Sequence, residues 1–214
     1  MLRREAKASS SDETETVEPA KRYAAHSVLR QGNWAKIRVP STGVYQITES
    51  LIPQAGFSNP SKVKIYGYGG NLHSEVLTPS DLIEKDDLKE VATCDVGGKR
   101  LFYALGPVSW ENNKSERRTR NYFSDYGYYF LTESDGEPLK VDSAAFVSSF
   151  YPSPYYYHDL YEKDGHAWYS GGRNLYDPTA VAVGGTYTAE LAANPNARQA
   201  VLSVHVSTKT GCRV

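Results

Sequence analysis

The sequence predicts a mainly β protein, with antiparallel, hairpin-rich and sandwich-like sheets, one or two short helices and long loops. The 214 residues include 17 Tyr, 17 Gly and 11 Pro but a single Met. Tyrosine suits half-buried pleated surfaces, while glycine and proline favour the short connections between strands. Several short segments also alternate apolar and polar residues, which is typical of strands with one solvated face.

The composition excludes several classes of protein. Hydrophobic residues make up 40% of the chain and charged residues 23%, which is the ordinary range for a globular protein. Because the net charge is only -1, no dominant field predicts binding to nucleic acid or to an acidic membrane surface. No run of 18 apolar residues predicts a transmembrane segment, and no apolar signal segment follows Arg4.

The composition along the chain predicts three parts. Residues 1–25 are expected to be a disordered leader, because this serine- and glutamate-rich stretch has little apolar surface to bury. Residues 26–180 are expected to form a β-rich N-terminal domain. Residues 181–214 are expected to begin a second β-sandwich that the chain does not finish, so the C-terminal sheet should be incomplete and the chain a fragment.

Local patterns predict the first elements of the β-rich domain. Trp34–Val39 alternates apolar and polar residues and is expected to form a hairpin with a strand at 44–48, through a turn at 40–43. Thr48 is expected to cap a short helix that Gly56 closes.

Other segments predict later strands, a hairpin and two loops. Gly97 and Gly98 should form the turn of a hairpin, whereas residues 71–98 otherwise read as loop with charged residues 84–87 on the surface. A charged loop is expected at 112–121, and either a short helix or a packed loop at 152–169. The strands are expected at 63–68, 91–96, 100–105, 126–132, 186–192 and 200–206.

No catalytic residue or metal site is predicted. A cysteine nucleophile needs a neighbouring base, and no local motif supplies one to Cys94, which is expected to be a small buried side chain. Cys212 has no such motif either. The closest pair of histidines, His158 and His166, stands eight residues apart without a nearby cysteine, which is not the spacing of a zinc site. No cofactor is predicted.

Two clusters invite a binding interpretation that their spacing does not support. Glycines 67, 69 and 70 follow a strand, but no helical pattern continues from them, so a tight turn is expected in place of a phosphate loop. The basic residues of 114–120 are expected to form a solvated loop, with anion binding as the alternative. The carboxylates of 84–90 lack the spacing of a calcium loop and are expected to be surface charge.

An aromatic segment near residue 155 provides the candidate site. Its rings suit either packing in a core or interface, which we favour, or a platform on which a sugar stacks. Arg173, in the stretch 171–177, is expected to tie polar groups together across a turn. The candidate ligand or interface residues are Tyr155, Tyr156, Tyr157, Trp168, Tyr169 and Arg173.

Several blocks, in the same order, resemble the N-terminal region of the gingipain-like cysteine peptidases, and among these the sortases of type IX secretion. The resemblance extends over roughly residues 26–206. The blocks are residues 27–29, 34–39, 42–48 (TGVYQIT), 62–70 (KVKIYGYGG), 86–91, 100–104, 106–110, 125–132 (DYGYYFLT) and 171–177 (GGRNLYD).

This resemblance implies an exported, multidomain protein at the cell surface and outer membrane. In the family, a β-rich region precedes a caspase-like catalytic domain with a Cys–His dyad. The sortases remove a C-terminal signal domain from cargo and attach the cargo to surface lipopolysaccharide. Because the dyad belongs to the later domain, no residue of this chain, Cys94 included, inherits a catalytic role.

The leading hypothesis is therefore a scaffolding or docking module for a peptidase domain that this chain lacks. Its implied partners are that domain, other type IX secretion components and lipopolysaccharide. Two alternatives are a β module that binds surface glycans or lipopolysaccharide, and a truncated remnant without function.

Overall fold

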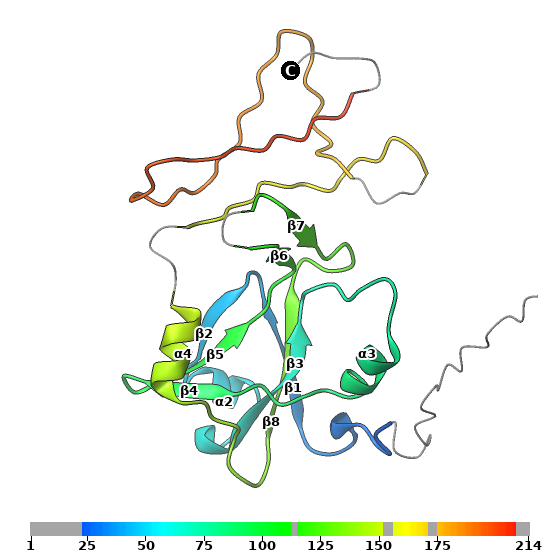
Figure 1. Cartoon of the computed structure of the whole chain (residues 1–214). Coiled ribbons are helices and arrows are strands. Elements are labelled where there is room, and N and C mark those ends of the chain that lie inside the picture. Colours follow the sequence, from blue (N-terminus) through cyan, green and yellow to red (C-terminus); the bar gives the residue numbers. More distant parts are fainter. Residues whose placement is uncertain (1–22, 113–114, 152–155, 171–174, 209–214) are drawn as a thin grey trace, which may run out of the picture.

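The structure is a computed structural model that describes residues 23–112, 115–151, 156–170 and 175–208. Within these ranges it contains eight strands in antiparallel sheets, three short α-helices and two 3-10 turns, joined by long loops (Figure 1). The predicted mainly β class is confirmed. None of the helices in these ranges is long and apolar enough to cross a membrane.

Sheet A consists of three antiparallel strands, β1 (Trp34–Val39), β8 (Gly127–Glu133) and β3 (Val63–Gly69), in the order β1-β8-β3. The central strand β8 buries Tyr129 and Leu131 on one face. Alternation along β1 is as predicted: Ala35, Ile37 and Val39 face the core, while the basic residues between them are exposed.

Sheet B has the order β2-β5-β4 and is also antiparallel, with β2 at Gly43–Ile47, β5 at Lys99–Ala104 and β4 at Thr93–Val96. The predicted hairpin between β4 and β5 is confirmed. The predicted hairpin of 34–39 with 44–48 is wrong, because β1 pairs with β8 and β2 pairs with β5. Alternation identifies the buried face of a strand but not its partner, and residues 40–42 carry the chain from one sheet to the other.

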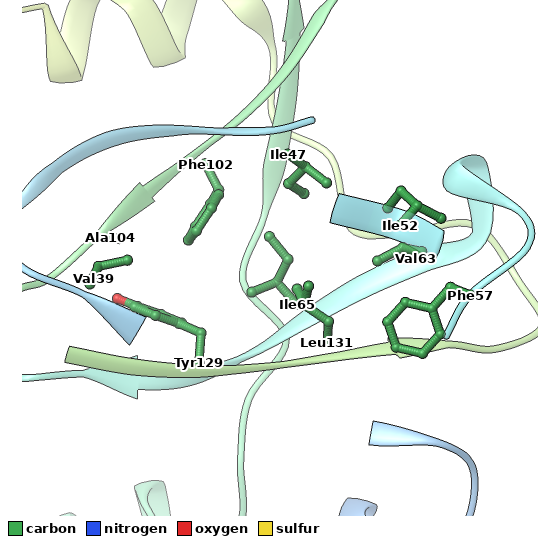
Figure 2. Packing of buried hydrophobic residues seen from close by; sticks show 10 residues of the cluster. All are labelled: Val39, Ile47, Ile52, Phe57, Val63, Ile65, Phe102, Ala104, Tyr129 and Leu131. Carbon is green, nitrogen blue, oxygen red and sulfur yellow. The ribbon is translucent and has the colours of Figure 1, made fainter. Parts of the chain in front are cut away.

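The hydrophobic core lies between the two sheets. Phe102 of sheet B packs edge-on against Tyr129 of sheet A, with ring centroids 5.6 Å apart (Figure 2). The Tyr129 hydroxyl accepts a hydrogen bond of 2.7 Å from the backbone N–H of Leu105, which satisfies the one polar group of a side chain that is 2% exposed. Burying a ring or an aliphatic side chain of this size contributes about 1.5–3 kcal/mol, so contacts between the sheets hold the fold together.

One end of the core is closed by α2 (Leu51–Gln54) and the 3-10 turn η2 (Pro60–Lys62), beside which Phe57 is buried (Figure 2). The predicted short helix is present and Gly56 follows it with a φ of 81°, as expected for a residue that ends a helix. The predicted cap is wrong: Ser50, and not Thr48, occupies the N-cap position.

Two further helices were not predicted. Helix α3 (Pro79–Glu84) lies in the region expected to be loop, and Thr78 with Asp81 forms a capping box at its start. This signal is readable in the sequence as a threonine and an acidic residue three positions apart around a proline. Helix α4 (Ser143–Phe150) is capped by Asp142 and packs beside β4.

The charged residues 84–87 are not simply surface charge. The half-buried Asp87 accepts hydrogen bonds from the hydroxyl of Ser27 at 2.8 Å and from the backbone N–H of Val28 at 2.6 Å. It thereby anchors the 3-10 turn η1 (Val28–Arg30). The expectation of free surface charge is wrong for Asp87, because its carboxylate is hydrogen-bonded to a segment some 60 residues away in sequence.

The C-terminal part departs most from the prediction. β6 (Val108–Trp110) and β7 (Arg118–Arg120) form a two-stranded antiparallel sheet, so the charged loop predicted at 112–121 is wrong for residues 118–120, which belong to β7. The strands predicted at 186–192 and 200–206 are absent. A strand requires a partner edge, and the described residues offer none beside these segments. The division into domains at residue 180 stays a prediction.

Glycine is required where the backbones of the two sheets approach each other most closely. A Cβ atom on Gly127 would lie 2.1 Å from the carbonyl oxygen of Leu105, and one on Gly106 would lie 2.5 Å from the backbone of Ser41. By contrast, a Cβ on Gly43 would meet no atom within 4 Å. The close approach therefore depends on particular glycines.

The first prediction concerns this close approach. Gly127→Ala should lower the free energy of unfolding by about 1–3 kcal/mol or more, because the contact partner is backbone and cannot rotate away. The matched variant Gly43→Ala should leave it unchanged or raise it by up to about 1 kcal/mol. Urea denaturation measures both, and equal effects would contradict the proposed steric cause.

The second prediction concerns Glu133, at the end of β8. Backbone N–H groups of Ser58 and Asn59 donate to its carboxylate and hold its pKa below the ordinary 4.5. Since the folded state favours the ionised form, this contribution to stability is present above pH 4.5 and is lost as the pH falls through the lowered pKa.

Glu133→Gln should therefore make the loss of stability between neutral and acid pH smaller than in the unmodified chain. Urea denaturation at a series of pH values measures this slope. The exposed Glu49→Gln provides a control with the same change of charge. A slope that Glu133→Gln leaves unaltered would contradict the role of these hydrogen bonds.

Candidate functional site

The candidate site lies where the β6–β7 hairpin meets residues 156–170 and 175–208, at one end of the molecule (Figure 1). Trp110 of β6 stacks on His158, with ring centroids 4.3 Å apart and planes 15° from parallel. The Nε2 atom of His158 lies 2.9 Å from the carbonyl oxygen of Ser115 and forms a hydrogen bond with it. The ring face of His158 is therefore occupied by stacking, and one ring nitrogen is occupied by a hydrogen bond.

An ion-pair cluster joins the same two segments. Arg118 contacts Glu162 at 2.6 Å, and Arg120 contacts Glu162 at 3.3 Å, Asp164 at 3.1 Å and Asp125 at 2.8 Å. The expectation of a solvated basic loop is wrong for these two arginines. They occupy alternate positions of β7 and so project from one face, toward carboxylates that lie about 40 residues later in the chain.

The ion-pair cluster is partly buried, so its stability depends on which charged side chains are present. Burial, partly offset by Arg120, raises the pKa of the Asp164 carboxyl. The Nε atom of Arg118 is buried without a hydrogen-bond partner, so part of its desolvation is uncompensated. Partly buried ion pairs contribute little net stability. Removing one partner is nevertheless destabilising, because the remaining charge is then buried without compensation. The cluster is therefore best understood as an orienting contact.

A second polar cluster cross-links the segments that follow. The carboxylate of Asp177 accepts hydrogen bonds from the hydroxyls of Tyr161 at 3.0 Å and Tyr187 at 2.8 Å, and from the backbone N–H of Thr179 at 2.8 Å. These bonds, that of Thr179 first, hold the pKa of Asp177 well below its usual value. Hydrogen bonding to Tyr161 and Asp177 raises the pKa of Tyr187 to about 12.

The predicted aromatic residues are in large part accessible. Trp168 is 40% exposed and Tyr169 84% exposed, and Tyr156 and Tyr157 are also exposed. Trp168 contacts the ring of His166 edge-on at 5.0 Å and donates from Nε1 to the hydroxyl of Ser207. Tyr155 and Arg173 lie outside the described residues. A ligand or interface role for these six residues stays a prediction.

Cys94 has the environment that the sequence predicts. It is 0% exposed on β4 and is paired with Leu101, on the face of sheet B where Tyr103 stacks on Phe150 of α4. Burial, followed by the charges of nearby carboxylates, raises the pKa of the thiol, so the sulfur is protonated at neutral pH. A protonated and inaccessible thiol is not a nucleophile. Cys212 lies outside the described residues.

The remaining candidates have structural explanations. Gly67 and Gly69 have the positive φ values expected of glycine, 141° and 80°, but the predicted tight turn is wrong, because both residues lie in β3 where its register with β8 shifts between Tyr66 and Gly69. No group of metal-ligating side chains is present among the described residues. Asp86, Asp87 and Glu90 act as anchors, since Asp86 accepts a hydrogen bond from the backbone of Ala24 and Glu90 accepts one of 2.6 Å from the backbone of Leu139. Glu84 is exposed, as predicted.

Sequence reasoning missed one surface, the outer face of sheet A. Trp34 meets Tyr66 edge-on at 5.4 Å, and Lys36 lies over the ring of Tyr128 at 3.8 Å. The signal was present in the sequence, because the outward positions of three strands carry aromatic or basic residues in place of small polar ones. The pairing of β1 with β8, which gathers them, was not predictable locally.

The chain was compared with family models, curated proteins and solved structures. No family model and no curated protein sequence match the chain. Among solved structures, the chain is similar to the crystal structure of dimeric latent PorU from Porphyromonas gingivalis, with 40% sequence identity and a TM-score of 0.43. The match covers 53% of this chain and 10% of that chain, so this chain spans about a tenth of the length of the PorU chain. The predicted resemblance of the sequence blocks to PorU is confirmed by this match.

The third prediction concerns the ion-pair cluster. Arg120→Ala should release residues 156–164 from the hairpin, because it leaves Glu162 paired with Arg118 alone and removes the cation that pairs with Asp164. Trypsin should then cleave after Lys163 faster, by roughly tenfold, since local opening controls proteolysis. Arg117→Ala, whose side chain is 81% exposed, is the matched control and should leave the rate unchanged. Equal rates for the two variants would contradict an orienting role for Arg120.

Proposed function

We propose that this chain is a non-catalytic, β-rich module that docks on and orients the cysteine peptidase domain of a larger PorU-like secretion protein. The observation that carries the proposal is the state of Cys94. Its thiol is fully buried beside α4 and its pKa is raised, so it cannot attack a substrate at neutral pH. Under this proposal, peptidase chemistry comes from another part of the parent protein.

The interface at the β6–β7 hairpin supports a docking role. The stack of Trp110 on His158 and the ion pairs of Arg120 hold residues 156–164 in a defined position against the β-rich part. Beyond it, exposed aromatic and aliphatic side chains such as Tyr169 and Val183 are available for contact with another domain. The resemblance in sequence adds the expected setting, which is the cell surface with type IX secretion components and lipopolysaccharide as partners.

A surface glycan-binding module is the second candidate. The observation in its favour is that the rings of Trp168 and Tyr169 remain 40% and 84% exposed, as a sugar-stacking surface requires. Lipopolysaccharide binding that Trp168→Ala abolishes would favour this candidate over docking.

The fourth prediction tests docking directly. The whole chain should bind the separately produced peptidase domain of Porphyromonas gingivalis PorU with a dissociation constant in the range of about 1–100 μM, typical of interfaces between domains. Tyr169→Ser should weaken binding, whereas Phe123→Ser, which removes an exposed ring elsewhere, should not. Calorimetric titration measures the three constants.

Two outcomes would contradict the proposal. The first is the absence of binding between the chain and the peptidase domain. The second is cysteine-dependent cleavage of a peptide substrate by the chain alone. Mass mapping after treatment with iodoacetamide identifies the reacting thiol, and Cys94 should be alkylated only after unfolding.

A further inference from the structure

The outer face of sheet A presents two cations at fixed positions. Lys36 pairs with Phe130 across the β1–β8 ladder, and Arg38 pairs with Tyr128, so all four side chains lie on one face of the sheet. Both cations belong to exposed residues. Residues two apart in a strand are separated by about 6.5–7 Å, which sets the distance between the two charges along the strand.

Each cation is held by an aromatic ring and not by a carboxylate. The Nζ atom of Lys36 lies 3.8 Å from the ring centre of Tyr128, and the guanidinium carbon of Arg38 lies 4.5 Å from the ring centre of Tyr126. No ion pair between either cation and a described carboxylate is present. The rings therefore restrict the two charges without neutralising them, which leaves them available to an anionic partner.

The same strand has an open edge. In sheet A, β1 pairs with β8 on one side only, and within the described residues its other side has no backbone partner. The opposite edge of the sheet is covered, because Gly67 and Ile65 of β3 exchange backbone hydrogen bonds with Lys89 and Val91. An uncovered edge strand is a template on which another strand can pair.

We propose that β1 accepts an extended acidic peptide segment of a partner protein as an added strand. Backbone hydrogen bonds to the open edge of β1 supply affinity. Carboxylates at alternate positions of the added strand meet Lys36 and Arg38 on the outer face. An i, i+2 spacing of the acidic residues is required, because it matches the spacing of the two cations.

Other occupants fit these observations less well. If β1 paired antiparallel with β1 of a second copy, Lys36 would face Arg38 of the other molecule, and like charges directly opposite are destabilising. A sugar would need bare ring faces for stacking, whereas the rings of Tyr126 and Tyr128 are already capped by cations. The inference is independent of the docking proposal, because it concerns another face and another partner.

The test is fluorescence anisotropy of the whole chain with a labelled heptapeptide in which glutamate alternates with valine. Saturable binding is expected. The double variant K36E/R38E should weaken it by roughly tenfold or more, since two attractive charge pairs become repulsive. K99E/R198E makes the same change of charge at exposed positions elsewhere and should shift the affinity by less than about twofold. Thermal unfolding followed by circular dichroism checks that both variants fold.

A second experiment separates strand addition from simple charge attraction. Two further heptapeptides carry N-methyl groups at alternate residues, one on the glutamates and the other on the valines. Each keeps its charges but loses the backbone N–H donors along one edge, and the two peptides (phases) differ in which edge this is. One phase should abolish binding and the other should retain it, because only one edge of an added strand pairs with β1.

Three results would overturn the proposal. They are the absence of saturable binding by the unmodified peptide, equal affinity for the unmodified chain and K36E/R38E, and equal affinity for the two N-methylated phases. Polygalacturonate serves as a glycan probe. If it binds through Lys36 and Arg38 while the peptide does not, the partner is an acidic polysaccharide and the proposal is wrong.

Discussion

The contact of Tyr129 with sheet B is the constraint on which the rest of the structure depends. Its ring packs against Phe102, and its hydroxyl accepts the backbone N–H of Leu105 at the end of β5. This one side chain therefore joins the central strand of sheet A to the central strand of sheet B. Gly106 and Gly127 allow the backbones to approach closely at the same place, where a side chain on either would meet main-chain atoms.

The position of the candidate interface follows from this crossing. The hairpin of β6 and β7 is inserted between β5 and β8, so both of its ends are held where the sheets meet. The backbone N–H of Asn121 bonds to Pro107 at 2.8 Å and its side-chain amide bonds to Gly70 at 2.7 Å, which close the base of the hairpin. A hairpin fixed at its base can present Arg120 to the segment beyond residue 156 in one orientation.

Two surfaces with different chemistry result from one scaffold. At the end of the molecule, charges are paired and partly shielded, so they orient a neighbouring segment. On the outer face of sheet A, Lys36 and Arg38 are stacked on rings and remain without carboxylate partners, so they are available to an anion. The thiol of Cys94 belongs to neither surface, because α4 covers that side of sheet B.

Predictions from sequence succeeded where the determining residues are neighbours in the chain. Alternation identified the buried face of β1, the two glycines at 97 and 98 identified the β4–β5 hairpin, and the lack of a local catalytic motif correctly favoured a buried side chain for Cys94. The capping box at Thr78 is also a local signal in the sequence, since Thr78 and Asp81 are only three residues apart.

The sequence by itself therefore determined the mainly β class, the faces of the strands, the turn at Gly97 and Gly98 and the burial of the thiol, because periodicity and turn chemistry act over a few residues. Only the tertiary structure decided that β1 pairs with β8, that Arg118 and Arg120 meet carboxylates some 40 residues later, and that residues 186–206 have no strand partner. Strand pairing and ion pairing depend on segments far apart in the chain, and local patterns carry no information on which distant segment will be adjacent.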